Sequence, residues 1–153
     1  MMLCKNKVLL RDINEDTDRI NQESQYLQEK AAGNVLIVDD EPAIRSILAR
    51  IISGKGHRAH TVSNGKAALT ELAKKVYDLL IVDLKMFGMS GRKLYETLNE
   101  ENPDTANKIV FITGDTMNEE TYDFLVSSER PYLAKPFNPN EIIDIVEKEL
   151  ATR

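Results

Sequence analysis

The feature that most constrains the fold is an alternation of short apolar runs with helical patterns from residue 34 onward. The apolar runs are VLIV (35–38), HRAHTV (57–62), LLIV (79–82), IVFIT (109–113) and YLA (132–134). The first, third and fourth runs are continuous and rich in β-branched residues, which is typical of strands covered on both faces of a parallel sheet. The run 57–62 is more polar, so we expect it at a sheet edge.

Helical patterns fill the segments between these runs. The expected helices are 42–53, 64–75, 90–98, one that begins with a Thr116–Glu119 capping box and one that Asn138 caps ahead of Pro139. Strands that alternate with helices imply a parallel sheet with helices on both faces, and five such units are too few for an eightfold barrel. We therefore predict an α/β fold with an open, doubly wound, five-stranded parallel sheet.

Residues 1–33 differ from the rest, because they are polar and show a weak heptad pattern that predicts an N-terminal helical extension. The heptad positions are Leu10, Ile13, Thr17, Ile20, Ser24, Leu27 and Ala31. Two interpretations remain open: a helix that pairs with a partner or with its own copy in a homodimer, or a solvated and partly frayed extension. The expected boundaries are 1–33 for this arm and 34–153 for the main domain.

Composition argues against several classes of function. Lys and Arg number 20 against 25 Asp and Glu, and a net charge of −5 disfavours general nucleic-acid binding. No apolar run approaches the roughly 20 residues of a membrane span, and the first residues lack a signal-peptide pattern. One cysteine fits a reducing cytoplasm, and one cysteine with two histidines is too few for a structural zinc site. We expect a cytoplasmic protein without nucleic-acid or membrane contact.

Reactive side chains follow the expected strands. They are Asp39-Asp40-Glu41 after the first strand, Asp83 after the third, Thr113 at the end of the fourth and Lys135 after the fifth. Singly, each has a structural explanation as a helix or turn cap, a strand residue or a surface charge. Parallel strands bring their carboxyl ends to one rim, however, and acids that crowd together there need a cation or protons.

The chemistry of these residues favours a hard cation and phosphoryl transfer. Carboxylate and carbonyl oxygens select Mg²⁺ or Mn²⁺ when Cys and His are lacking. A carboxylate beside such an ion can attack phosphorus and form an aspartyl phosphate. Lys135, the Thr113 hydroxyl and backbone N–H groups after Asp83 would stabilise the transferring group.

Four motifs occur in an order and at spacings that resemble a known family. They are VLIVDDEPAIR, YDLLIVDLKMFGMSG, VFITGD and YLAKPF, and with them residues 34–150 resemble the receiver domain of two-component response regulators. The resemblance implies a flavodoxin-like strand order 2-1-3-4-5, Mg²⁺ as cofactor with Mn²⁺ as a substitute, and a histidine kinase or phosphotransfer protein as partner. Residues 111–137 further resemble receivers at the C-terminus of hybrid sensor histidine kinases. We expect either a standalone receiver with a helical arm or the end of a larger kinase.

The resemblance also assigns the phosphoryl and metal sites. It implies that Asp83 accepts the phosphoryl group. Asp39 and Asp40 would hold Mg²⁺ together with Asp83 and the backbone carbonyl of Lys85.

A second set of residues would read out the phosphoryl group. By resemblance, the Thr113 hydroxyl turns toward it, Lys135 pairs with it, and the Lys135–Pro136 bond is cis. Tyr132 would be the aromatic switch residue, and its alternative role is a core filler near the rim.

The loop after Asp83 departs from the family pattern at Phe87, which stands where proline is usual. Proline stiffens a loop, so we expect Phe87 to loosen it and to expose an aromatic ring. Lys85 and Asp115 each lie two residues after a site residue. We hypothesise that they form an ion pair over the phosphate, and that this pair, or Lys85 alone, slows hydrolysis of the phosphate. The alternative is two independent solvated charges.

The main functional hypothesis is a phosphoacceptor receiver that switches its surface near the fourth and fifth strands. Such a chain is not an enzyme, beyond assisting its own phosphorylation and dephosphorylation. One alternative is a Mg²⁺-dependent phosphatase with an aspartyl nucleophile, but the haloacid dehalogenase type needs an acid where this chain has Lys85. Another is a non-phosphorylated interaction module, against which the complete set of site residues argues.

Overall fold

The computed structural model describes residues 14–25 and 32–152. The chain divides into two units, Met1–Ala32 and Gly33–Arg153. In the first unit residues 14–25 form a helix, which carries Thr17, Ile20 and Ser24 of the heptad pattern. The other heptad positions lie outside the described residues, namely Leu10, Ile13, Leu27 and Ala31. The coiled coil therefore stays a prediction.

The second unit contains a five-stranded parallel sheet in the order β2-β1-β3-β4-β5. Its strands are β1 (Asn34–Val38), β2 (Arg58–Val62), β3 (Leu79–Asp83), β4 (Ile109–Thr113) and β5 (Tyr132–Ala134). The predicted strand order is confirmed, and the most polar of the long strands, β2, lies at an edge.

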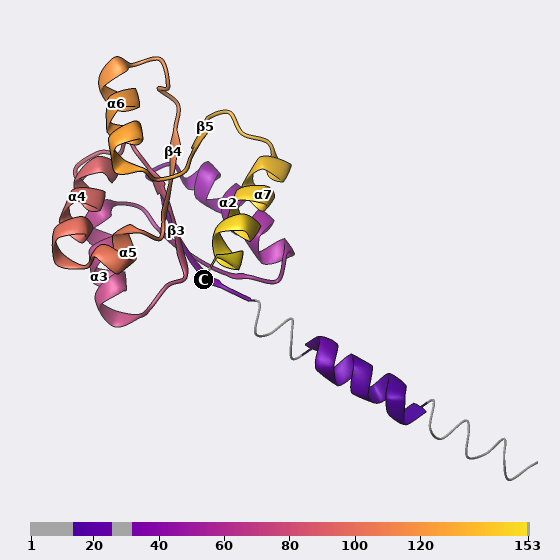
Figure 1. The fold of residues 1–153 in the computed structure, drawn as a ribbon. Helices are drawn as coiled ribbons and strands as arrows, with labels where there is room; N and C mark the ends of the chain where they lie inside the picture. Colours follow the sequence, from indigo (N-terminus) through magenta and orange to yellow (C-terminus); the bar gives the residue numbers. More distant parts are fainter. Residues whose placement is uncertain (1–13, 26–31, 153) are drawn as a thin grey trace, which may run out of the picture. The chain divides into compact units, whose positions relative to one another are not determined.

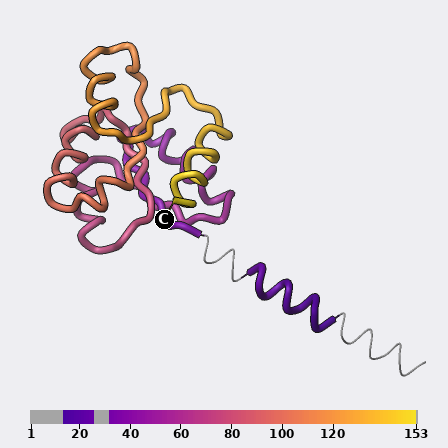
Figure 2. Tube along the Cα trace, viewed as in Figure 1, coloured from indigo at the N-terminus to yellow at the C-terminus, as the bar shows by residue number. Residues whose placement is uncertain are grey.

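Helices cover both faces of this sheet (Figures 1 and 2). They are α2 (Pro42–Gly54), α3 (Gly65–Lys74), α4 (Gly91–Glu101), α5 (Pro103–Ala106), α6 (Glu119–Ser128) and α7 (Pro139–Ala151). Helices α2 and α7 pack on one face, whereas α3, α4 and α6 pack on the other. This arrangement confirms the predicted doubly wound α/β fold.

The core forms two apolar layers because successive strand residues point to opposite faces. In β1, Val35 and Ile37 join the layer under α2 and α7, whereas Leu36 and Val38 join the layer under α3, α4 and α6. Every residue of β3 and β4 is buried. Burial of one of their apolar side chains contributes about 1.5–3 kcal/mol, so these strands form a rigid support for the polar residues at their ends.

Local signals placed some helix starts well and others poorly. Asn138 caps α7, as predicted, and forms a capping box with Glu141. The Thr116 capping box is wrong, because Asn118 caps α6 and accepts the Thr121 N–H at 3.1 Å. Helix α5 was not predicted, since its four residues are too short to show a period.

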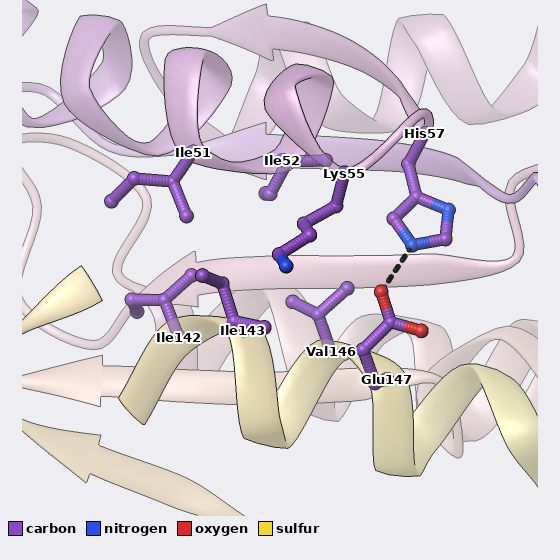
Figure 3. A pocket seen from close by; sticks show the side chains of 8 residues that line it. All are labelled: Ile51, Ile52, Lys55, His57, Ile142, Ile143, Val146 and Glu147. Carbon is purple, nitrogen blue, oxygen red and sulfur yellow. Dashed lines mark hydrogen bonds and ion pairs between the residues drawn. The ribbon is translucent and has the colours of Figure 1, made fainter. Parts of the chain in front are cut away.

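His57 lies near the amino-terminal ends of the strands and connects the residue before β1 to helix α7. Its Nδ1 accepts the Gly33 N–H at 3.1 Å, so Nε2 carries the proton that is donated to Glu147 Oε1 at 2.9 Å. Figure 3 shows the bond from His57 to Glu147 at the side of an apolar pocket between α2 and α7. The apolar lining consists of Ile51, Ile52, Ile142, Ile143 and Val146.

Candidate functional site

Four acidic side chains converge at the carboxyl ends of β1 and β3. Strand β1 leads directly into Asp39, Asp40 and Glu41, and β3 ends at Asp83. Carboxylate oxygens of these four residues all lie within 4.8 Å of one another. The structure thus brings together the three predicted metal-binding acids and adds Glu41.

Lys135 is the cation that faces these acids. Its Nζ lies 3.5 Å from Asp83 Oδ1, 3.3 Å from Asp39 Oδ2 and 3.3 Å from Glu41 Oε1. Burial alone would lower the pKa of the Lys135 ammonium, but the Asp83 and Asp39 carboxylates raise it above its ordinary value. The lysine therefore stays charged and is shared among several carboxylates.

Asp83 and Asp39 are almost completely buried, with exposed fractions of 4% and 1%. Burial raises the pKa of Asp83 to about 6, and the negative charge of Asp39 adds to this effect while Lys135 opposes it. The raised pKa means that, in the metal-free protein, nearby positive charge does not fully compensate the negative charge of the Asp83 carboxylate. The donor set consists of carboxylate oxygens, which fit Mg²⁺ or Mn²⁺ and not a soft metal.

The neighbouring strands β4 and β5 supply the two other polar groups of the site. Thr113, at the end of β4, is buried, and its hydroxyl accepts the Asp115 N–H at 3.1 Å. The Lys135 N–H donates to the Thr113 carbonyl at 2.8 Å, which fixes the lysine beside β4. The Lys135–Pro136 bond is cis, as predicted.

The loop between β3 and α4 leads to Gly91, the first residue of α4, which lies close to the backbone of Asp83. A Cβ atom added to Gly91 would overlap the carbonyl oxygen of Asp83, so this approach requires glycine. Gly88 has φ +79°, a conformation that also favours glycine. Phe87 is 91% exposed, which confirms the predicted exposed aromatic, and its N–H donates to Asp40 Oδ2 at 3.1 Å.

Two further predictions concern side chains above the rim. Lys85 Nζ and Asp115 Oδ2 form the predicted ion pair between the β3–α4 and β4–α6 loops. Tyr132 lies on β5 and is 39% exposed, so it is not a core filler. The Lys85 carbonyl as a metal ligand and the switch roles of Thr113 and Tyr132 stay predictions.

Sequence reasoning missed three contacts of the site. Besides the Glu41–Lys135 pair and the Phe87 N–H, Arg45 Nη1 donates to the Asp39 carbonyl at 2.7 Å. Glu41 adjoins the predicted pair, and Arg45 follows it by one helical turn, so their spacing held a signal. The Phe87 bond uses a backbone N–H, which the usual proline lacks. The replacement of proline therefore permits the bond, but residue type alone does not identify its partner.

This geometry agrees with the comparison to known families. The family model of the response regulator receiver domain matches residues 35–147. The chain belongs to the response regulator receiver family. It is a receiver domain of the kind that accepts phosphoryl groups in two-component signalling. Receiver domains bind Mg²⁺ at an acidic pocket and interact with histidine kinases or phosphotransfer proteins.

The relatives include both a sensor kinase and a regulator. Sensor histidine kinase GacS of Pseudomonas protegens is 31% identical over 133 residues, which are 85% of this chain and 14% of that protein. Nitrogen assimilation regulatory protein NtrX of Azorhizobium caulinodans is 30% identical over 123 residues, which are 79% of this chain and 27% of that protein. The chain thus spans only a minor part of both relatives.

Solved structures show the same fold. Response regulator TrrA of Thermotoga maritima, in complex with Mg²⁺-BeF, is 31% identical with a TM-score of 0.67 over 76% of this chain and 97% of that one. A response regulator structure from Chloroflexus aurantiacus is 28% identical with a TM-score of 0.71 over 78% of this chain and 98% of that one. Within residues 14–25 and 32–152, no helix has the length and apolar character needed to cross a membrane.

Proposed function

We propose that Asp83 takes a phosphoryl group from the phosphohistidine of a partner kinase or phosphotransfer protein. A carboxylate oxygen of Asp83 bonds to phosphorus while the bond from phosphorus to the imidazole nitrogen breaks, and the imidazole leaves with the electron pair. The observation that carries this proposal is the buried Asp83, with Asp39 and Asp40 oxygens within 4.8 Å and Lys135 Nζ at 3.5 Å.

Asp39, Asp40, Asp83 and the backbone carbonyl of Lys85 are the proposed Mg²⁺ ligands. When bound, the ion neutralises negative charge on the carboxylates and on the phosphoryl oxygens. The complex of TrrA with Mg²⁺-BeF supports this assignment, because that relative is 31% identical over most of this domain. We propose that Mn²⁺ replaces Mg²⁺, since the donors are all oxygens.

Lys135 and Thr113 then hold the phosphoryl group. Lys135 already contacts Asp83, so a small shift carries its ammonium from the carboxylates to a phosphoryl oxygen. The Thr113 hydroxyl has a proton to donate once it turns toward the same group. Because this contact exists only in the phosphorylated state, it favours one arrangement of β4, α6 and β5, and Tyr132 on β5 follows that change.

The test is incubation with acetyl phosphate and Mg²⁺, followed by measurement of acid-stable, base-labile phosphate. The wild-type chain is expected to carry one such phosphate, and Asp83→Asn none. Replacing Mg²⁺ by Mn²⁺ is expected to preserve the reaction, and excess chelator to abolish it. Rapid turnover of small phosphate esters would instead indicate a phosphatase, and no modification would indicate an interaction module.

We also propose that the Lys85–Asp115 pair slows hydrolysis of the aspartyl phosphate. The pair bridges the two loops that flank Asp83, so it restricts the approach of water to phosphorus. Lys85→Ala is expected to shorten the phosphate lifetime several-fold. Asp115→Asn, which leaves Lys85 in place, should have a smaller effect. If the lifetime of the aspartyl phosphate were unchanged in Lys85→Ala, the Lys85 and Asp115 charges would have no influence on hydrolysis.

A homodimer through the N-terminal helix is a further proposal. It is supported by Ile20, an apolar heptad residue that is 64% exposed on the helix of residues 14–25. Sedimentation of the full chain is expected to show a dimer that Ile20→Lys dissociates. A wild-type monomer at all concentrations would overturn the proposal.

A further inference from the structure

The backbone of Phe87 contacts one of the proposed metal ligands. Its N–H donates to Asp40 Oδ2 at 3.1 Å, across the gap between the β3–α4 loop and the loop after β1. The ring of Phe87 is 91% exposed, so it contributes little packing. The part of Phe87 that acts on the site is therefore its backbone N–H.

Asp40 needs such a contact more than Asp39 and Asp83 do. Those two carboxylates are buried and lie against Lys135, whereas Asp40 is exposed. An exposed carboxylate on two rotatable bonds samples several rotamers unless a hydrogen bond holds it. A carboxylate has about four acceptor positions, so one N–H leaves others free for a cation.

The residue type at position 87 decides whether this contact exists. Proline, which is usual in the loop that this one resembles, has no N–H and forms no such bond. The bond also opposes the looser loop expected from the sequence, because it ties the loop to Asp40. Removal of a group that hydrogen-bonds to a metal ligand, without contacting the metal itself, typically lowers metal affinity by about 10–100-fold.

We propose that the Phe87 N–H is a positioning group that holds the Asp40 carboxylate for the cation and thereby strengthens Mg²⁺ binding. This inference rests on the proposed function, which places Mg²⁺ at Asp39, Asp40 and Asp83. Coupling is reciprocal, so Mg²⁺ in turn strengthens the bond from Phe87 to Asp40.

The experiment compares Mg²⁺ affinity in three full-length chains by titration calorimetry. Phe87→Pro removes the N–H, and Phe87→Ala is the matched control that removes the ring but keeps the N–H. We expect Phe87→Pro to weaken binding by about 10-fold or more and Phe87→Ala to stay within about twofold of wild type. Equal or tighter binding by Phe87→Pro, or an equal loss in Phe87→Ala, would overturn the inference.

A second measurement needs no variant. In the wild-type chain, Mg²⁺ is expected to slow hydrogen exchange of the Phe87 amide and to shift its proton resonance downfield. An amide that Mg²⁺ leaves unchanged would overturn the inference while phosphorylation of Asp83 still stands. A wild-type chain that binds no Mg²⁺ and takes no phosphoryl group would overturn the proposed function itself.

Discussion

The two rims of the sheet use polar side chains in opposite ways. At the amino-terminal rim, several polar contacts each join one donor to one acceptor. The Tyr77 hydroxyl donates to Glu71 at 2.6 Å, and the Asn34 N–H donates to the Asp78 carboxylate at 2.8 Å. His57 likewise joins Gly33 to Glu147. Such closed pairs have little left to offer a ligand, so they serve stability.

At the carboxyl-terminal rim, charges of one sign outnumber their partners. Asp39, Glu41 and Asp83 share Lys135, and Asp40 stands beside them. Crowding these carboxylates, of which Asp39 and Asp83 are buried, costs stability in the metal-free protein, and a cation or phosphoryl group with its own contacts offsets that cost. Counting the partners of each buried charge therefore separates a structural polar cluster from a binding site.

His57→Ala should have the largest effect on stability. The Gly33 N–H would lose its buried acceptor and the core side chain would leave a cavity, so we expect a loss of about 2–4 kcal/mol of unfolding free energy. Glu147→Ala is the control: its side chain is 51% exposed, so its loss should cost about 1 kcal/mol or less. Chemical denaturation followed by circular dichroism measures both. If the folded His57→Ala variant no longer took up phosphate, the conclusion that the amino-terminal rim serves only stability would be wrong.

Asp83→Asn should stabilise the metal-free protein, although it removes the phosphoryl acceptor. The folded-state pKa of Asp83 is about 6 against an ordinary 3.8, so the folded chain holds its proton to higher pH than the unfolded chain. Its contribution to stability is therefore full below pH 3.8 and is lost as pH rises through 6.

The expected gain for Asp83→Asn at pH 7.5 is about 1–3 kcal/mol, and it should be smaller at pH 5. Denaturation in excess chelator at both pH values measures it. Mg²⁺ should stabilise the wild-type chain more than the variant, which lacks one of the proposed carboxylate ligands. The difference in unfolding free energy between the two chains should therefore become smaller. If the variant were less stable than the wild type at both pH values, the Asp83 charge would be fully compensated by Lys135. Asp83 would then resemble the paired groups at the amino-terminal rim.

Tyr77→Phe tests a single closed pair at the amino-terminal rim. The Tyr77 side chain is 2% exposed, and burial together with Glu71 raises the pKa of its hydroxyl. Removing the hydroxyl should cost about 1 kcal/mol at any Mg²⁺ concentration. Glu71→Gln keeps an oxygen acceptor and should cost less. A loss for Tyr77→Phe that depends on Mg²⁺ would couple the two rims.

Glu129→Gly should have the smallest effect. Glu129 ends α6 in the left-handed region at φ 56°, where a side chain is strained and glycine is not. We expect a gain of up to about 1 kcal/mol in the free energy of unfolding, with no change in phosphate uptake. Glu129→Ala should bring no gain. Equal results for both variants would show that backbone strain is not the cause.

The sequence predicted the fold because its central strands are continuous apolar runs that admit few alternatives. The convergence of Asp39 and Asp83 followed from their places at the ends of parallel strands. The ion pair of Lys85 with Asp115 followed in the same way. Contacts that depend on backbone groups did not follow from residue type. The Phe87 N–H and the cap of α6 by Asn118 both depend on the local path of a loop.

The most direct test identifies the side chain that carries the phosphate. The protein is incubated with acetyl phosphate and Mg²⁺, reduced with borohydride and digested, and the peptides are sequenced by mass spectrometry. Reduction converts an aspartyl phosphate to homoserine, so we expect homoserine at position 83 and nowhere else, and only when Mg²⁺ is present. Homoserine at position 39 or 40, or modification that does not depend on the metal, would rule out Asp83 as the metal-dependent phosphoryl acceptor.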